Sequence, residues 1–235
     1  MNKKATTSSY NDRLFNKPGL RSYLHNSRFQ WFKNAITDFD VKTLKVFELG
    51  CFDGKLLEYF VVNPAFYAGY DADWEGGLSD AKEKLSSETI TFTKSSSSKD
   101  LKVFAEKHFD ISAAMETLEH LPVDLVNDYL LEISRITKSY LLVTVPNEKG
   151  IVFFFKFLTK SIFLDGNQEY TFKEFVYAVT GQMEKIEQND HKGFDYAKLV
   201  SQISEYFDIV KVEAIPFKFL PKFLGFTVGI IAKPK

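Results

Sequence analysis

The strongest constraint on the fold is a regular alternation of short apolar runs with amphipathic segments between residues 44 and 145. The apolar runs have the length of strands and lie at residues 44–49, 66–70, 89–93, 109–115 and 140–145. Segments with helical spacing separate them, at residues 55–62, 78–85, 101–107 and 123–137. Strands that alternate with helices in this way predict βαβ units and a parallel sheet.

The chain leaves this rhythm after residue 150 and later returns to it. An aromatic run at residues 151–158 is followed by a predicted helix at 171–180. A helix at residues 195–206 and two apolar runs at 209–215 and 226–232 complete the chain, and the two runs suit a hairpin-like return. We therefore expect a leader with helices at residues 1–40 and one α/β domain at 41–235, with an insertion or lid at about residues 150–192.

Charge and cysteine usage exclude several classes of protein. Cys51 is the one cysteine in 235 residues, so an intramolecular disulfide cannot form. The net charge of -1 argues against a nucleic-acid partner, because the surfaces of proteins that bind nucleic acids are strongly basic. The polar N-terminus lacks the apolar stretch of a secretory signal, and the longest apolar run is too short to cross a bilayer. A cytoplasmic protein is the expectation.

The first strand ends in a glycine turn that can approach a ligand. Gly50 and Gly54 frame this turn, and Glu48 near the strand's end can accept a hydrogen bond from a ligand ammonium. Asp71 ends the next strand, which lies beside the first in a doubly wound sheet. A carboxylate at that point can reach two ribose hydroxyls. These residues predict a nucleoside-containing ligand at the switch point of the sheet.

The turn does not fit a dinucleotide. A dinucleotide fingerprint has the pattern Gly-x-Gly-x-x-Gly, which leaves room for a pyrophosphate. Phe52 and Lys55 stand where the second and third glycines belong. A nicotinamide enzyme is therefore disfavoured.

Four segments resemble the motifs of class I S-adenosylmethionine-dependent methyltransferases, in the family's order. They are Phe-Glu-Leu-Gly-Cys-Phe-Asp-Gly at 47–54, Gly-Tyr-Asp at 69–71, Met-Glu-Thr-Leu-Glu-His-Leu-Pro at 115–122 and Leu-Val-Thr-Val-Pro-Asn at 142–147. The resemblance implies a Rossmann-like, doubly wound, mostly parallel seven-stranded sheet of order 3-2-1-4-5-7-6. It also implies helices on both faces and an aromatic-rich insertion after strand 5.

The same resemblance implies a set of site residues. The residues that would bind S-adenosylmethionine are Glu48, Gly50, Cys51, Phe52, Gly54, Asp71, Met115 and Glu116. Cys51 and Phe52 would contribute backbone, whereas Met115 and Glu116 would flank the sulfonium and the adenosine. Phe52 departs from the family, which usually has glycine there, so its side chain must point away from the methionine moiety or narrow the pocket.

The histidines and the nearby acids are the candidates for catalysis. A base helps when the methyl acceptor is a hydroxyl, and His191 and Glu116 are the predicted catalytic residues. His25 and His108 are interpreted as structural. No metal ligand is predicted in the main interpretation. In the alternative, Glu116, Glu119, His120 and His191 resemble the Mg²⁺ site of small-RNA 3′-terminal 2′-O-methyltransferases.

The aromatic run bears on the acceptor. Bulky apolar side chains with Lys156 and Lys160 favour an apolar or lipid-linked small molecule, and aromatic rings also stack on sugars. The leading hypothesis is O-methylation of a small molecule or glycan. A homodimer contact, a peripheral membrane contact, an RNA 2′-O-methyltransferase and an inactive binding module with this fold are the alternatives left open.

Overall fold

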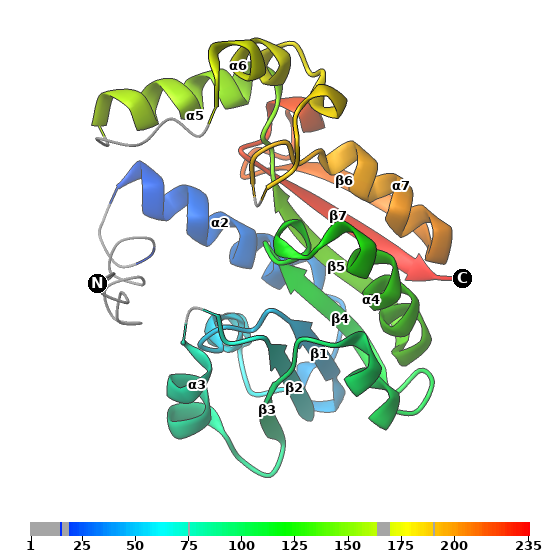
Figure 1. The fold of residues 1–235 in the computed structure, drawn as a ribbon. Helices are drawn as coiled ribbons and strands as arrows, with labels where there is room; N and C mark the ends of the chain where they lie inside the picture. Colours follow the sequence, from blue (N-terminus) through cyan, green and yellow to red (C-terminus); the bar gives the residue numbers. More distant parts are fainter. Residues whose placement is uncertain (1–14, 16–18, 75, 164–169, 190) are drawn as a thin grey trace.

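A computed structural model of the chain describes residues 15, 19–74, 76–163, 170–189 and 191–235, without the side chains of 160–163 (Figure 1). Residues 1–14 and 16–18 of the predicted leader, and 164–169 and 190 of the predicted insertion, therefore lie outside the described residues.

The described chain forms one seven-stranded sheet in the order β3-β2-β1-β4-β5-β7-β6. The first five strands are parallel, and β7 is antiparallel to both β5 and β6. This is the strand order that the resemblance to the methyltransferase family implied. The strands are β1 (Lys45–Leu49), β2 (Phe66–Asp71), β3 (Ile90–Lys94), β4 (Phe109–Met115), β5 (Thr137–Pro146), β6 (Phe207–Ile215) and β7 (Thr227–Pro234).

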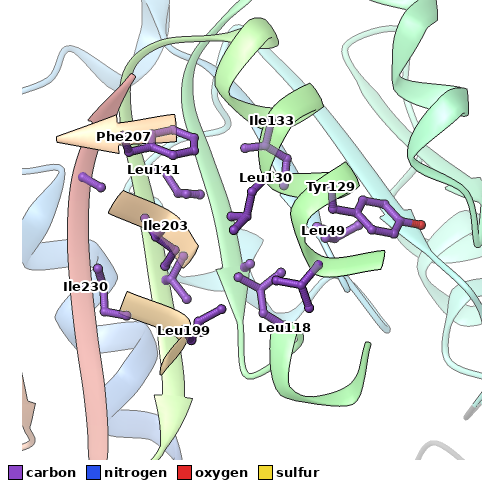
Figure 2. Close-up of a cluster of buried hydrophobic side chains, with 14 of the residues drawn as sticks. Leu49, Leu118, Tyr129, Leu130, Ile133, Leu141, Leu199, Ile203, Phe207 and Ile230 are labelled. Carbon is purple, nitrogen blue, oxygen red and sulfur yellow. The ribbon is translucent and has the colours of Figure 1, made fainter. Parts of the chain in front are cut away.

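Helices cover both faces of the sheet, as predicted (Figure 1). One face packs against α4 (Val123–Ile136) and α7 (Tyr196–Tyr206). In α4 the buried side chains of Val126, Leu130 and Ile133 recur at helical spacing, which aligns them in a stripe toward the sheet. Figure 2 shows Leu130 and Ile133 of α4 lying near Leu199 and Ile203 of α7 over the strands.

The opposite face packs against α2 (Leu20–Ala35) and α3 (Leu78–Leu85). Phe32 of α2 is fully buried. Trp31 lies so close to β7 that a methyl group added at Gly229 would be 2.6 Å from its ring. The indole Nε1 of Trp31 also donates a hydrogen bond to Glu213 of β6 at 2.8 Å. Helix α2 is therefore anchored to the sheet through buried contacts.

The segment after β5 forms α5 (Gly150–Phe163) and α6 (Phe172–Val179), which lie beyond the sheet at the top of Figure 1. Phe153 packs with Ala178 and Met183 in a small separate core, whereas Phe155 is exposed. Some side chains of the aromatic run are therefore buried in this small core, and others are exposed on the surface. Among the described residues, no helix combines the length and the apolar character needed to cross a bilayer.

Two segments predicted as α-helices are shorter 3-10 helices. The prediction at residues 55–62 is wrong beyond Tyr59, because η3 (Lys55–Tyr59) is a 3-10 helix in which Lys55 and Glu58 pair at three-residue spacing. The prediction at 101–107 is likewise replaced by η4 (Ser98–Val103). There the guanidinium of Arg135 donates to the carbonyls of Leu101 and Phe104, which a longer helix would use internally.

Candidate active site

A cavity of about 700 Å³ opens at the carboxyl ends of β1, β2 and β4. Ligands of parallel sheets bind at this edge, and the volume is in the range of pockets that enclose a small molecule. The predicted site residues that line the cavity are Glu48, Gly50, Cys51, Phe52, Asp71, Met115, Glu116 and His191. Gly54 is the predicted residue that does not reach its wall.

The two glycines of the first turn are required by its backbone. Gly50 has φ +75°, and a side chain there would start 2.1 Å from the hydroxyl of Thr117. Gly54 has φ +79°, and its added methyl would lie 2.7 Å from Leu85. Gly50 thus lets the turn run against the loop after β4, whereas Gly54 lets the turn pack closely against Leu85.

Phe52 holds a strained position between the two glycines. Its φ is +46°, a conformation that residues other than glycine rarely adopt. Its ring packs on Gly77, where an added methyl would lie 2.5 Å from the ring. The absence of a side chain at Gly77 therefore gives the Phe52 ring a place beside the turn.

Asp71 joins the first turn to the end of β2. Its carboxylate accepts hydrogen bonds from the backbone N–H of Phe52 at 2.8 Å and of Asp73 at 2.6 Å. A carboxylate has about four acceptor positions. Because Asp71 also lines the cavity, it is held in place by the backbone and can still accept from a ligand.

Glu48 is buried at the floor of the cavity. It accepts a short hydrogen bond from the hydroxyl of Tyr67 on β2. Burial raises the pKa of Glu48 to about 8, because the charged form is poorly solvated there. A cationic ligand group beside it would favour the ionised carboxylate.

Glu116 follows β4 in a left-handed conformation with φ +54°. Its carboxylate pairs with the guanidinium of Arg28 at 2.7 Å and accepts from the hydroxyl of Thr227 at 2.9 Å. Burial alone would raise its pKa, but Arg28, with smaller contributions from His25, Lys156 and Thr227, holds the pKa of Glu116 below its usual value. Glu116 is therefore ionised and a weak base.

Two histidines of the cavity wall, His120 and His191, lie close to a second glutamate, the buried Glu119. The rings of His120 and His191 lie 4.6 Å apart between centroids, and His120 Nε2 is 4.0 Å from the carboxylate of Glu119. One ligand atom from each of the three residues lies within 4.8 Å of the others. Glu116 does not belong to this group, because its carboxylate faces Arg28 and Thr227.

Helix α2 contributes a wall that the sequence interpretation missed. Arg21, His25, Arg28 and Phe29 line the cavity, although the sequence placed them in a leader and interpreted His25 as structural. The first three are four and three residues apart, a spacing that places side chains on one helical face. That spacing is the sequence signal from which a common face for these side chains could have been predicted. Ser95 and Ser96, which follow β3, also line the cavity.

Comparisons with known proteins agree with this geometry. Residues 47–141 match the family model described as a methyltransferase domain, whereas no curated protein matches the chain. The PH0226 protein from Pyrococcus horikoshii OT3 is 14% identical with a TM-score of 0.61, covering 98% of this chain and 100% of that chain. Magnesium protoporphyrin IX methyltransferase from Synechocystis PCC 6803, solved with bound S-adenosylhomocysteine, is 14% identical with a TM-score of 0.59, covering 98% and 95%.

A third solved structure is the methyltransferase domain of bacterial CtHen1-CN. It is 19% identical with a TM-score of 0.57, covering 89% of this chain and 99% of that chain. The matched segment and the solved structures agree on one fold. Residues 47–141 match a methyltransferase domain, and the chain has the Rossmann-like fold of the solved methyltransferases, as the sequence motifs indicated.

Proposed function

We propose that this protein is an S-adenosylmethionine-dependent methyltransferase that methylates an oxygen of a small molecule or saccharide. The observation that carries the proposal is the convergence of the predicted site residues, all except Gly54, on one cavity at the carboxyl edge of the sheet. Apart from His191, these residues lie in or directly after three strands that are separate in sequence and neighbours in the sheet. The similar enzyme from Synechocystis, solved with bound S-adenosylhomocysteine, supports the same ligand here.

Each part of the cavity has a task in this proposal. The cofactor supplies an electrophilic methyl group, and the chain supplies position. Asp71 accepts from the ribose hydroxyls, Glu48 accepts from the ammonium, and the bare backbone at Gly50 lets the amino-acid moiety pass. His191 takes the proton when the acceptor is a hydroxyl, because a neutral imidazole nitrogen can accept a proton. Glu116, held ionised by Arg28, orients groups rather than removing protons.

The alternative of an inactive binding module depended on Phe52 closing the cavity. The ring of Phe52 packs on Gly77 beside the turn, and the cavity retains about 700 Å³. That arrangement favours a cofactor-binding protein.

Calorimetry with S-adenosylhomocysteine tests the proposal. We expect the wild-type protein to bind with a dissociation constant in the micromolar range. Asp71→Asn, which loses one carboxylate oxygen, should bind at least about tenfold more weakly, which corresponds to about 1.4 kcal/mol. Asp208→Asn, at an exposed position on β6, is the matched control and should bind like wild type. No binding by wild-type protein at millimolar ligand would contradict the proposal.

A second candidate, a metal-assisted RNA 2′-O-methyltransferase, is favoured by the group of Glu119, His120 and His191. Two imidazoles and one carboxylate suit Mn²⁺ or Zn²⁺ better than Mg²⁺, which prefers oxygen ligands. The pairing of Glu116 with Arg28 also removes one oxygen ligand from the predicted set. The residues therefore fit Mg²⁺ poorly.

Binding of Mn²⁺ distinguishes the two candidates without an acceptor. The second candidate requires that Mn²⁺ binds the wild-type protein and that His191→Ala no longer binds it. His108→Ala is the control, because His108 lies outside the group. Absence of Mn²⁺ binding at millimolar metal would rule out the metal-assisted candidate and leave the first proposal intact.

A further inference from the structure

One face of α2 presents basic side chains to the cavity. Arg21, His25 and Arg28 all line it, together with Lys55 from η3. This wall stands on the β4 and β7 side of β1, where Arg28 pairs with Glu116 and Glu116 bonds to Thr227. The ribose-binding candidate Asp71 stands on the β2 side of β1. The basic wall therefore borders the part of the cavity away from Asp71.

The charges of this wall are only partly neutralised. Lys55 is paired with Glu58 at 2.5 Å, and one nitrogen of Arg28 is paired with Glu116. The buried Nε of Arg28 has no hydrogen-bond partner among the described residues. Arg21 is exposed at the wall and forms neither a hydrogen bond nor an ion pair with the described part of the chain. One full positive charge and one unused buried donor are thus available to a ligand.

Aromatic rings flank Arg28. The guanidinium of Arg28 lies 4.9 Å from the ring centroid of Phe29 and 5.5 Å from that of Phe15, and both rings are buried. His25 adds no charge, because burial lowers its pKa to about 4. In such apolar surroundings an ion pair with a ligand is stronger than in water. A ligand that joins an apolar group to an anion matches this wall.

The charge of Glu116 narrows the kind of anion. A phosphate monoester carries close to two negative charges at neutral pH and would be repelled by the ionised Glu116 beside Arg28. A carboxylate carries one charge, and its planar pair of oxygens matches the fork of a guanidinium. The wall therefore favours a carboxylate.

We infer that the α2 face is a carboxylate-binding subsite and that the acceptor is an apolar carboxylic acid held through Arg21 and Arg28. This inference rests on the proposed function, since it names the substrate class of the same cavity. The carboxylate bound there can belong either to the acceptor or to the amino-acid moiety of the cofactor. We assign it to the acceptor, and the experiment below distinguishes the two.

The acceptor arm uses two acids and their neutral counterparts. Benzoate, benzamide, octanoate and octanamide are titrated into wild-type protein saturated with S-adenosylhomocysteine. We expect at least one acid to bind at least about tenfold more tightly than its amide, and Arg21→Gln to remove that preference. Arg21→Lys should retain part of it. Lys33→Gln, which removes an exposed cation of α2 outside the cavity, should behave as wild type.

The cofactor arm compares S-adenosylhomocysteine with 5′-methylthioadenosine, which lacks the carboxylate. If Arg21→Gln weakens the first ligand and spares the second, the carboxylate belongs to the cofactor and the acceptor inference is overturned. The acceptor inference is also overturned if neither acid is preferred over its amide, or if the preference persists in Arg21→Gln. Absence of S-adenosylhomocysteine binding appears before any acid is added and would count against the proposed function itself.

Discussion

The hydroxyl of Tyr67 on β2 donates a hydrogen bond to the carboxyl group of Glu48 on β1, in the fully buried centre of the sheet. Burial raises the pKa of Glu48 to about 8 from its ordinary value of 4.5. The folded protein therefore keeps a proton on Glu48 under conditions in which the unfolded chain has lost it. This difference has consequences for stability and for ligand binding.

Glu48 makes the fold less stable as the pH rises. Between pH 4.5 and 8 the unfolded chain binds fewer protons at this position, so the free energy of unfolding falls by at most about 1.4 kcal/mol per pH unit. Glu48→Gln removes this contribution to the pH dependence. The free energy of unfolding of the variant, measured by urea denaturation, should therefore rise relative to that of wild type as the pH increases from 5 to 8. A stability difference that is the same at both pH values would contradict the raised pKa.

Ligand binding should release this proton. A ligand ammonium beside Glu48 favours the carboxylate and lowers its pKa. We expect binding of S-adenosylhomocysteine at pH 7.5 to release up to about one proton, seen as a dependence of the calorimetric enthalpy on the ionisation enthalpy of the buffer. Glu48→Gln should show a much smaller dependence. Equal proton release by both proteins would exclude Glu48 as the source.

Gly50 should tolerate no side chain. Gly50→Ala combines a φ of +75° with a methyl group 2.1 Å from Thr117, so the turn must move. We expect loss of S-adenosylhomocysteine binding by calorimetry. Gly76→Ala is the matched control, since Gly76 has φ +79° with no atom within 4 Å of an added methyl. It should cost only about 1 kcal/mol in backbone strain, measured by urea denaturation, and preserve binding. Similar binding by the two variants would contradict the close approach at Gly50.

The Arg28–Glu116 pair should be costly to break from one side. Arg28→Met leaves the buried Glu116 carboxylate without its cation and should lower the free energy of unfolding by about 3–5 kcal/mol. The double variant Arg28→Met/Glu116→Gln removes both charges and should recover much of this loss in urea denaturation. Additive losses in the double variant would show that the two side chains do not interact.

Most strands and helices could be predicted because they leave local signals, whereas the strand order was implied by the resemblance to the methyltransferase family. Apolar runs ended by Gly50 and Asp71 marked two strand ends, and the helical stripe with Val126 marked α4. The motifs after β1, β2 and β4 also indicated which residues converge on one cavity, and the structure places all but Gly54 in its wall.

The rest depends on contacts that no local pattern contains. The spacing of Arg21 and Arg28 defines a helical face but not the surface it covers, and the partner Glu116 is 88 residues beyond Arg28 in the chain. The approach of His120 to His191 was implied by the family resemblance but by no local pattern, since the segment after β4 must meet the segment before α7. The position of the Phe52 ring depends on the missing side chain of Gly77, in another element. Tertiary packing decides each of these.

The residues of α2 that line the cavity lie outside the segment that matches the family model, so the two parts of the site can change independently in evolution. The matched family segment, residues 47–141, contains the β1 turn, Asp71 and the loop after β4. Arg21, His25 and Arg28 precede that segment, and Thr227 follows it. If α2 binds the acceptor as proposed, substitutions on one of its faces would exchange one acceptor for another while residues 47–141 stay the same. Under the proposed function, we therefore expect proteins with similar residues 47–141 and different α2 faces to methylate different acceptors.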